Sequence, residues 1–152
     1  MGTGIATSGM RALPVGFPKL MVSIMVGKGG IEWYVGTKDI VLMPSVCDLQ
    51  GLNRLSKMIL ANAAGAIAGM VEARESVDFG SSERPVVAMS ENGTTTKCGI
   101  YVKAALEEKG YEVVVFAGAG VGGRAQEEFI RDNPVVGVIE LAIYEVVGVL
   151  IL

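Results

Sequence analysis

The sequence predicts an α/β protein, folded as a Rossmann-like three-layer sandwich with a mostly parallel sheet of about five strands. Short apolar runs rich in valine and isoleucine alternate with segments of helical periodicity, and this alternation is typical of βαβ units. Hydrophobic residues make up 51% of the 152 residues, and a chain of this length can bury a substantial core. We therefore expect residues 1–152 to form a single Rossmann-like domain.

Each element follows from a local pattern. The strands are expected where apolar runs lack a helical period, at 19–26, 39–43, 85–89, 111–116 and 135–139. The helices are expected where apolar residues recur at helical spacing, at 5–13, 52–73, 95–109 and 122–131. Gly110 is expected at the C′ position that ends the third helix. The segment 142–152 fits either a helix or a strand.

The charge balance and the missing histidine exclude several classes of function. The net charge is −3, so no basic excess is present to neutralise a phosphate backbone, and we expect no nucleic-acid partner. The chain contains no histidine, which excludes Ser–His and Cys–His catalysis within it. Cys47 and Cys98 form no disulfide framework and no leader peptide is apparent, so a cytoplasmic location is expected. Cys98 is expected to be buried.

Two apolar stretches are interpreted as buried elements of a globular domain. The first, 58–71, is too short to span a bilayer and contains Asn62. The second, 135–152, contains Glu140 and Glu145, each of which is costly in lipid. We therefore expect no membrane partner.

The strongest local feature is a glycine-rich turn between the strand at 111–116 and the next helix. It contains four glycines and an arginine, Gly118, Gly120, Gly122, Gly123 and Arg124. Glycines allow the backbone to approach a ligand closely, a helix N-terminus offers free N–H groups, and arginine suits phosphate or carboxylate. This pattern predicts an anion site at the carboxyl edge of the sheet. The alternative is a tight turn that needs small residues, with Arg124 paired to a nearby carboxylate.

Two further segments carry candidate ligand groups. Gly93 and the hydroxyls of Thr94, Thr95 and Thr96 line the turn before the third helix, where Thr94 could also serve as the N-cap. Asp48 and Asn53 could bind a ribose or Mg²⁺, or could cap the helix at 52–73. No metal site is predicted from the protein side chains alone. For the ribose-binding acid of a dinucleotide fingerprint, Glu140 is a poor match.

Four blocks resemble one family over nearly the whole chain, namely MRALPVGFPK, YVGTKD, LNRLSK and GVGGRA. The family is that of the ATP-binding domain found in the tomato inhibitor of tobamovirus RNA replication and its bacterial, archaeal and fungal relatives. Its members have two Rossmann-like subdomains, and this chain is similar to the second, so we expect it to be a fragment of a larger protein. The resemblance also implies ATP binding, self-association and, in the plant protein, binding to a viral replication protein.

The chain departs from the family pattern at three places. Residues 117–120 read AGAG where the family commonly reads HATG, and residues 142–145 read AIYE in place of TTTE. Lys97 stands where the family usually has proline. Two of these changes replace polar side chains by apolar ones at turns that could hold a ligand.

Three hypotheses follow. The first is a nucleotide-binding module for ATP, with or without Mg²⁺, whose phosphates contact the turns Gly93–Thr96 and Gly118–Arg124 while Asp48 or Asn53 reaches the sugar or the metal. The second is a non-catalytic, homo-oligomeric protein-interaction module that has lost ligand binding, with the helix at 52–73 and the apolar C-terminus as its interface. The third is an enzyme acting on a small phosphorylated or carboxylated metabolite through Asp39, Asp48 or Glu145.

Overall fold

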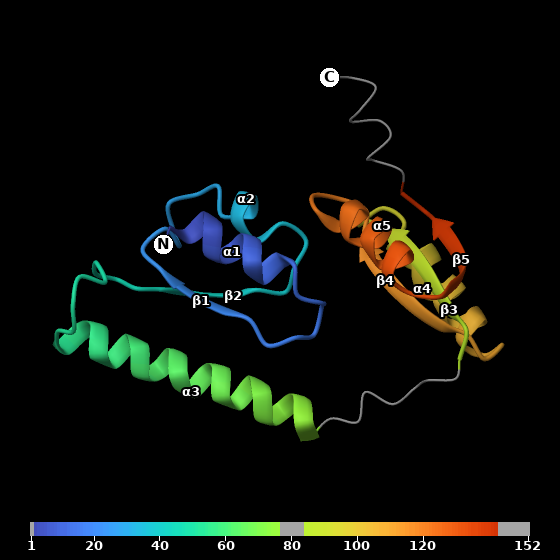
Figure 1. Ribbon diagram of the computed structural model, residues 1–152. Helices are drawn as coiled ribbons and strands as arrows, with labels where there is room; N and C mark the ends of the chain where they lie inside the picture. The colour runs from blue at the N-terminus through green and yellow to red at the C-terminus, as the bar shows by residue number, and fades with distance from the viewer. Residues whose placement is uncertain (1, 77–83, 143–152) are drawn as a thin grey trace. The chain divides into compact units, whose positions relative to one another are not determined.

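The structure is a computed structural model that describes residues 2–76 and 84–142 (Figure 1). The chain divides into two compact units, Met1–Phe79 and Gly80–Leu152. Each unit is built from parallel strands and the helices that connect them, so the α/β class predicted from the sequence is confirmed. That the two units pack into one domain, as expected above, stays a prediction.

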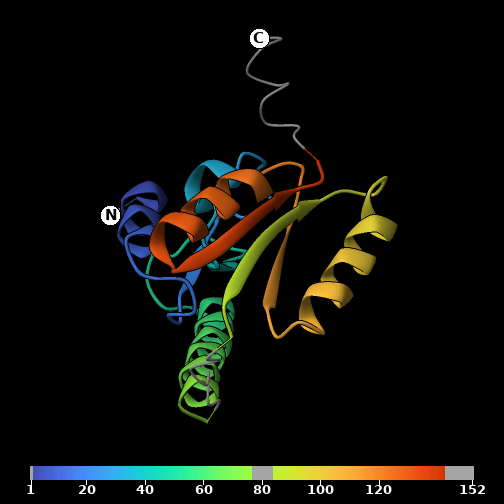
Figure 2. The same cartoon turned by 90° about the vertical axis from the view of Figure 1, so that its right-hand side faces the viewer.

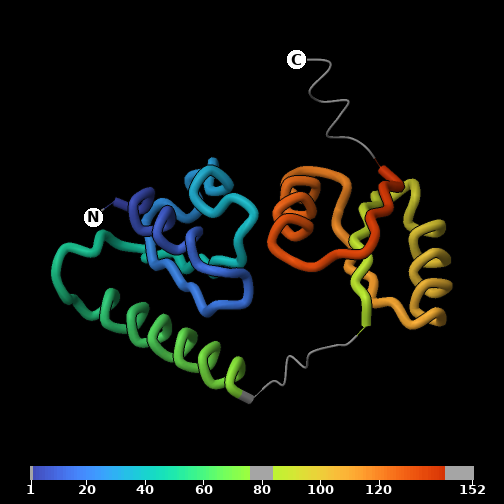
Figure 3. The backbone as a smooth tube through the Cα atoms, turned by 45° about the vertical axis from the view of Figure 1, so that its right-hand side comes forward, coloured from blue at the N-terminus to red at the C-terminus, as the bar shows by residue number. Residues whose placement is uncertain are grey.

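The N-terminal unit contains α1 (Thr3–Arg11), β1 (Leu20–Ser23), α2 (Glu32–Val35), β2 (Val41–Pro44) and α3 (Arg54–Ser76). The two strands pair in parallel, with Leu20 beside Val41 and Ser23 beside Pro44. The long helix α3 packs against β1, and the path of the chain through this unit can be followed in Figure 3.

The C-terminal unit contains β3 (Val86–Glu91), α4 (Thr96–Glu107), β4 (Glu112–Ala117), α5 (Gly122–Asp132) and β5 (Val135–Glu140). Its three strands are parallel, in the order β4-β3-β5. The helices α4 and α5 lie on opposite faces of this sheet (Figure 2). The central strand β3 is buried along most of its length and supplies Val87, Ala88 and Met89 to the core.

The prediction of one sheet of about five strands is wrong in its pairing. The described residues contain five strands, but these form one sheet of two strands and one of three. The alternation of apolar runs and helices predicts that strands exist, whereas pairing depends on contacts between residues far apart in the chain. The short helix α2 was not predicted, since four residues give no readable period.

Strand β1 is also shorter than the predicted 19–26. After Ser23 the chain turns, because the Ser23 Oγ accepts a hydrogen bond from the Met25 N–H at 3.1 Å. Serine side chains that bond to nearby backbone compete with strand pairing. The apolar letters of Ile24 to Val26 therefore belong to a turn in spite of their β propensity.

Lys19 ties the N-terminal unit together from a buried position. Only 2% of the residue is exposed, and its ammonium donates to the carbonyls of Pro14 at 2.8 Å and Phe17 at 2.9 Å. The third acceptor is Asp39 Oδ1 at 2.7 Å. All three ammonium protons are thus satisfied, and the segment before β1 is fixed to the segment before β2.

Asp39, the partner of Lys19, lies at the surface of the N-terminal unit. Its Oδ2 accepts the Gly16 N–H at 2.8 Å, and its side chain is 42% exposed. Burial raises the pKa of the Asp39 carboxyl, but the hydrogen bonds from Lys19 and the Gly16 N–H outweigh burial. The net pKa therefore lies below its ordinary value of 3.8.

We predict that Asp39→Asn lowers the free energy of unfolding by about 1–2 kcal/mol at neutral pH. The loss is at the low end for a buried pair because the carboxylate is partly solvated. Since the folded-state pKa is depressed, the stabilisation is complete above pH 3.8 and is lost as the pH falls through the folded pKa. Urea unfolding followed by circular dichroism at several pH values measures this. The exposed Glu32→Gln serves as control, and equal effects of the two variants would contradict the prediction.

Candidate functional site

The carboxyl edge of the three-stranded sheet brings two of the predicted ligand turns together. Strands β3 and β4 end side by side, with Glu91 in register with Ala117. One residue further, the Gly118 N–H donates to the Glu91 carbonyl at 2.6 Å. Because α4 and α5 leave this edge toward opposite faces of the sheet (Figure 2), the ends of β3 and β4 form a topological switch point, the usual ligand position in open α/β sheets.

The glycines after β4 are required by the turn itself. A Cβ on Gly122 would lie 1.9 Å from the Ala117 carbonyl oxygen, and one on Gly118 would lie 2.8 Å from the Ala142 Cβ. Gly120 adopts a φ of +66°, which side chains with a Cβ rarely adopt. Gly123, in the first turn of α5, is buried. Part of the alternative explanation, a tight turn that needs small residues, therefore holds.

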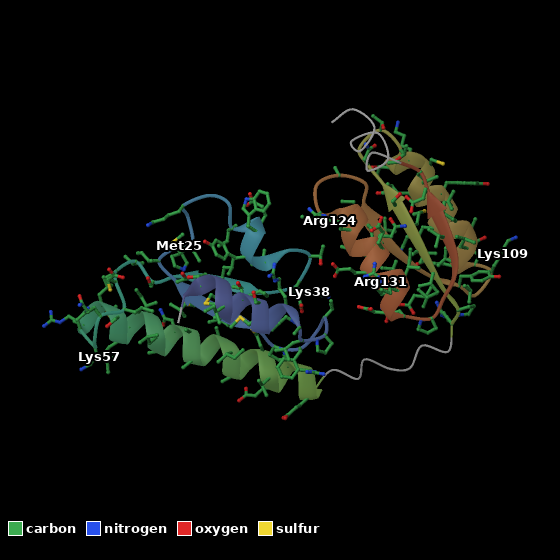
Figure 4. The ribbon with its side chains drawn as sticks, turned by 45° about the horizontal axis from the view of Figure 1, so that its top comes forward. Met25, Lys38, Lys57, Lys109, Arg124 and Arg131 are labelled. Atoms are coloured by element: carbon green, nitrogen blue, oxygen red, sulfur yellow. The ribbon has the colours of Figure 1, made fainter. Side chains whose placement is uncertain are left out.

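Arg124 does not fit the other part of that alternative. Its side chain is exposed in the first turn of α5, where Figure 4 labels it together with Arg131 of the last turn. No hydrogen bond or ion pair joins Arg124 to any other residue that the structure describes. Its guanidinium is thus not occupied by a neighbouring carboxylate there, and all of its donors are available to an anion.

The threonine turn before α4 is organised around Asn92. Thr94 Oγ1 donates to Asn92 Oδ1 at 2.8 Å, and the hydroxyls of Thr95 and Thr96 donate to the Asn92 carbonyl at 3.2 and 3.0 Å. Since each hydroxyl proton is directed into the turn, the hydroxyl oxygens can act further only as acceptors, and Thr95 Oγ1 already accepts the Asn92 N–H at 3.1 Å. The donors left at this turn are the backbone N–H groups of Gly93 and Thr96, neither of which bonds to a described group.

At this turn one alternative does not hold and one expectation was wrong. The N-cap of α4 is Thr95 and not Thr94, because Asn92 accepts the Thr94 N–H at 3.2 Å and starts the turn one residue later than expected. Cys98 is exposed instead of buried, since it lies on the side of α4 that the sheet does not cover.

Sequence reasoning did not connect three polar residues behind this edge. Glu140, at the end of β5, accepts the Ser90 hydroxyl at Oε2 and the Gln126 amide at Oε1, the latter at 2.7 Å. Ser90 and Gln126 come from β3 and α5 and are both buried. The signal in the sequence was a glutamate at the end of an apolar strand, which was considered only as a poor match for a ribose-binding acid.

A second carboxylate, that of Glu91, lies against the first turn of α4. A Cβ on Gly99 would fall within 1.8 Å of the Glu91 Oε2, so glycine at this position is what allows the carboxylate to approach. Sequence reasoning assigned no role to Glu91, because the contact requires α4 to fold back along β3. The candidate anion site thus has an acidic neighbour.

The remaining two predicted site residues, Asp48 and Asn53, lie in the N-terminal unit. Asn53 caps α3: its Oδ1 accepts the Ser56 N–H at 2.9 Å, while the Ser56 Oγ accepts the Asn53 N–H at 2.9 Å. This reciprocal pair is a capping box, the structural role that the sequence left open for Asn53. Asp48, which is exposed, makes no capping bond to any residue in the described part of the chain.

Asp48 lines a cavity of about 170 Å³ at the carboxyl ends of β1 and β2. The polar wall of this cavity includes Thr3, Ser23 and Ser45, and the hydroxyls of Thr3 and Ser23 lie 2.8 Å apart. Next to it, Val46 has a φ of +61°, and the Cys47 N–H donates to the Ser45 carbonyl at 2.6 Å. A β-branched residue in this conformation is strained, which no pattern in the sequence reveals.

Of the three carboxylates named for an enzyme, one is committed to a structural role. Asp39 pairs with Lys19, Asp48 is exposed at the cavity described above, and Glu145 lies outside the described residues, as does the apolar tail from residue 143. In the described ranges 2–76 and 84–142, no three histidine, cysteine, aspartate or glutamate side chains cluster as metal ligands. No helix in those ranges has both the length and the hydropathy to cross a bilayer.

Parallel strands, connecting helices and polar turns at the carboxyl edge define an α/β protein of the open-sheet class. The chain belongs to an uncharacterised protein family, UPF0261. Residues 1–76 match the N-terminal domain of that family and residues 84–151 match its C-terminal domain, so the family boundary falls between the two units of the structure.

Relatives are found in plants and bacteria. The chain is 43% identical over 148 residues to the ToMV resistance protein Tm-1 of Solanum lycopersicum. The aligned part makes up 95% of this chain and 20% of the tomato protein. It is 45% identical over 144 residues to a UPF0261 protein of Clostridium tetani, covering 95% of this chain and 35% of that protein. A UPF0261 protein of Mesorhizobium japonicum is 43% identical over 150 residues, 99% of this chain and 36% of its own length. The chain thus spans between a fifth and about a third of these relatives.

We predict that Gly122→Ala lowers the free energy of unfolding by about 2–3 kcal/mol, because the added methyl group would overlap the Ala117 carbonyl and force the backbone to shift. Gly93→Ala is the matched control, since a Cβ there meets nothing within 4 Å, and its effect should stay within about 0.5 kcal/mol. Urea titrations of both variants test this. Similar losses of unfolding free energy for the two variants would contradict the close approach of the Gly122 Cα to the Ala117 carbonyl.

Proposed function

We propose that the carboxyl edge of the three-stranded sheet binds the phosphates of a nucleotide, with ATP as the expected ligand. The observation that carries the proposal is the state of the helix N-termini. Both α4 and α5 begin at this edge without a side-chain cap and without an acidic residue in the first turn. The helix α3, by contrast, is closed by Asn53 and Ser56. Open N-termini present N–H donors and a positive dipole end to an anion.

Each turn contributes a different part of the proposed site. The turn Gly118–Arg124 supplies backbone donors and the unoccupied guanidinium of Arg124, which can bind phosphate oxygens in a bidentate manner. The turn Gly93–Thr96 supplies the N–H groups of Gly93 and Thr96. Because Glu91 adds negative charge beside α4, we expect the nucleotide to enter with Mg²⁺, which neutralises phosphate charge. That Asp48 or Asn53 of the N-terminal unit binds the sugar or a metal stays a prediction from the sequence.

The proposal extends to location and partners. Two free thiols, Cys47 and Cys98, and a ligand such as ATP both suit the cytoplasm. The tomato relative is named for resistance to a virus. Because this chain is similar to it, the proposal includes a protein partner.

We predict that ATP with Mg²⁺ at millimolar concentration raises the thermal unfolding midpoint of the chain and that Arg124→Ala weakens binding roughly ten- to a hundredfold. The reason is that the substitution removes charge-assisted hydrogen bonds worth about 1.5–3 kcal/mol. Arg131→Ala, at the other end of α5 (Figure 4), is the matched control and should bind as the wild type does. The absence of any shift with the wild-type chain would refute the nucleotide proposal.

A second candidate function, a homo-oligomeric interaction module, is favoured by the surface of α3. This helix presents few residues to its own unit, with Ser56 and Ala63 buried, while Leu55, Met58 and Val71 are exposed. Met58 is 62% exposed. Leu55 and Met58 are three residues apart and so share one side of α3, and exposed apolar side chains that gather on one side of a helix are typical of a protein–protein interface.

We predict that the chain elutes as an oligomer in size-exclusion chromatography with light scattering and that Met58→Glu shifts it toward the monomer. A buried carboxylate without a partner would oppose association at the helix face. Lys28→Glu introduces the same side chain at an exposed loop position and should leave the assembly unchanged. A monomeric wild-type chain would rule out this second function.

A further inference from the structure

The polar cluster of Glu140, Ser90 and Gln126 connects three elements behind the candidate phosphate site. Glu140 ends the edge strand β5, Ser90 lies in the central strand β3, and Gln126 lies in α5. Both carboxylate oxygens of Glu140 are used, one by the Ser90 hydroxyl and the other by the Gln126 amide at 2.7 Å. We infer that Glu140 is a positioning residue, which sets the orientation of the first turn of α5; the inference rests on the proposed function.

Burial makes this cluster costly to break. Ser90 is 1% exposed and Gln126 is 2% exposed, so neither can exchange its partner for bulk water. A buried donor that loses its acceptor retains its full desolvation cost. Glu140 is exposed at the sheet edge, so it keeps contact with solvent while it accepts both bonds.

The position of Gln126 in α5 explains what the cluster orients. Gln126 is the fifth residue of α5 and comes two residues after Arg124. Two residues correspond to a rotation of about 200° around a helix axis, so that fixing Gln126 toward the sheet directs Arg124 away from it. The buried amide and the exposed guanidinium are therefore set by the same rotation of α5.

The same side of α5 makes a second contact with the sheet, of a different kind, because Phe129 lies three residues after Gln126 and so near it on the helix surface. Phe129 packs against Phe116 of β4, with ring centroids 5.4 Å apart. An aromatic contact tolerates small rotations, whereas the two hydrogen bonds of Glu140 do not. The cluster therefore supplies the directional constraint and the aromatic pair supplies apolar packing. This division of roles also explains why a glutamine, and not an apolar residue, occupies the buried position 126.

The test compares amide hydrogen exchange at residues 122–126 with that of β3 in the full chain without nucleotide. Glu140→Ala should raise exchange in the first turn of α5 about tenfold, the factor that corresponds to losing a hydrogen bond to a charged group, and should leave β3 unchanged. Glu140→Gln retains one acceptor oxygen and should give an intermediate increase. The control is Glu127→Ala, an exposed glutamate of the same helix, for which no increase is expected.

Binding of ATP with Mg²⁺ to the same variants provides the second arm. Glu140→Ala should weaken binding about tenfold, and Glu127→Ala should not. Exchange that rises equally in α5 and β3, or that does not change, would overturn the positioning role. If the wild-type chain binds no nucleotide, the proposed function fails, while the exchange measurement still decides whether Glu140 orients α5. If Glu140→Ala does not fold, the comparison of Glu140→Gln with Glu127→Ala makes the same decision.

Discussion

The hydrogen bond from the Gly118 N–H to the Glu91 carbonyl, at 2.6 Å, continues the parallel pairing of β3 and β4 beyond the last residues of both strands. This bond keeps the two strands close at the point where the backbone leaves each of them in a different direction. The close approach excludes a side chain at Gly118, and the return of the chain into α5 excludes one at Gly122. The arrangement of both polar turns, and with it the candidate site, depends on this contact.

In the N-terminal unit the comparable constraint is electrostatic. Its two strands share one short parallel ladder, which is little to hold a unit together. The ammonium of Lys19 adds three hydrogen bonds, to two carbonyls and to Asp39, at the start of that ladder. Because all three protons of the ammonium group are hydrogen-bonded, Lys19 can be buried at this place. The segments that supply the acceptors, before β1 and before β2, are thereby held near each other.

The local pattern of the sequence was sufficient for most elements but not for their association. Within the residues that the structure describes, apolar runs and helical periods located the five strands and four of the five helices, and Gly110, with a φ of +87°, ends α4 as expected. The division into two sheets could not be predicted, because one valine-rich run pairs as well as another until side chains pack. Strand β1 stopped early for a similar reason, since a single hydroxyl at Ser23 decides it.

The candidate site shows the same division. The glycine and threonine turns were predicted at the ends of β3 and β4 and lie there side by side. The direction of the threonine hydroxyls toward Asn92 depends on the geometry of one turn, and the link of Ser90 to Glu140 joins residues fifty positions apart. Strain at Val46 is likewise a property of the folded backbone. Such contacts produce no periodic pattern in the sequence from which they could be predicted.

Burial of Lys19 also makes the lysines of the N-terminal unit chemically unequal. Acylating reagents and acetyltransferases need a deprotonated, accessible amine, and the side chain of Lys19 has no exposure to solvent. Lys28 and Lys57 are exposed and meet no such barrier. In the folded protein, amine chemistry therefore spares position 19, and a modified Lys19 marks a molecule that was open when the reagent reached it.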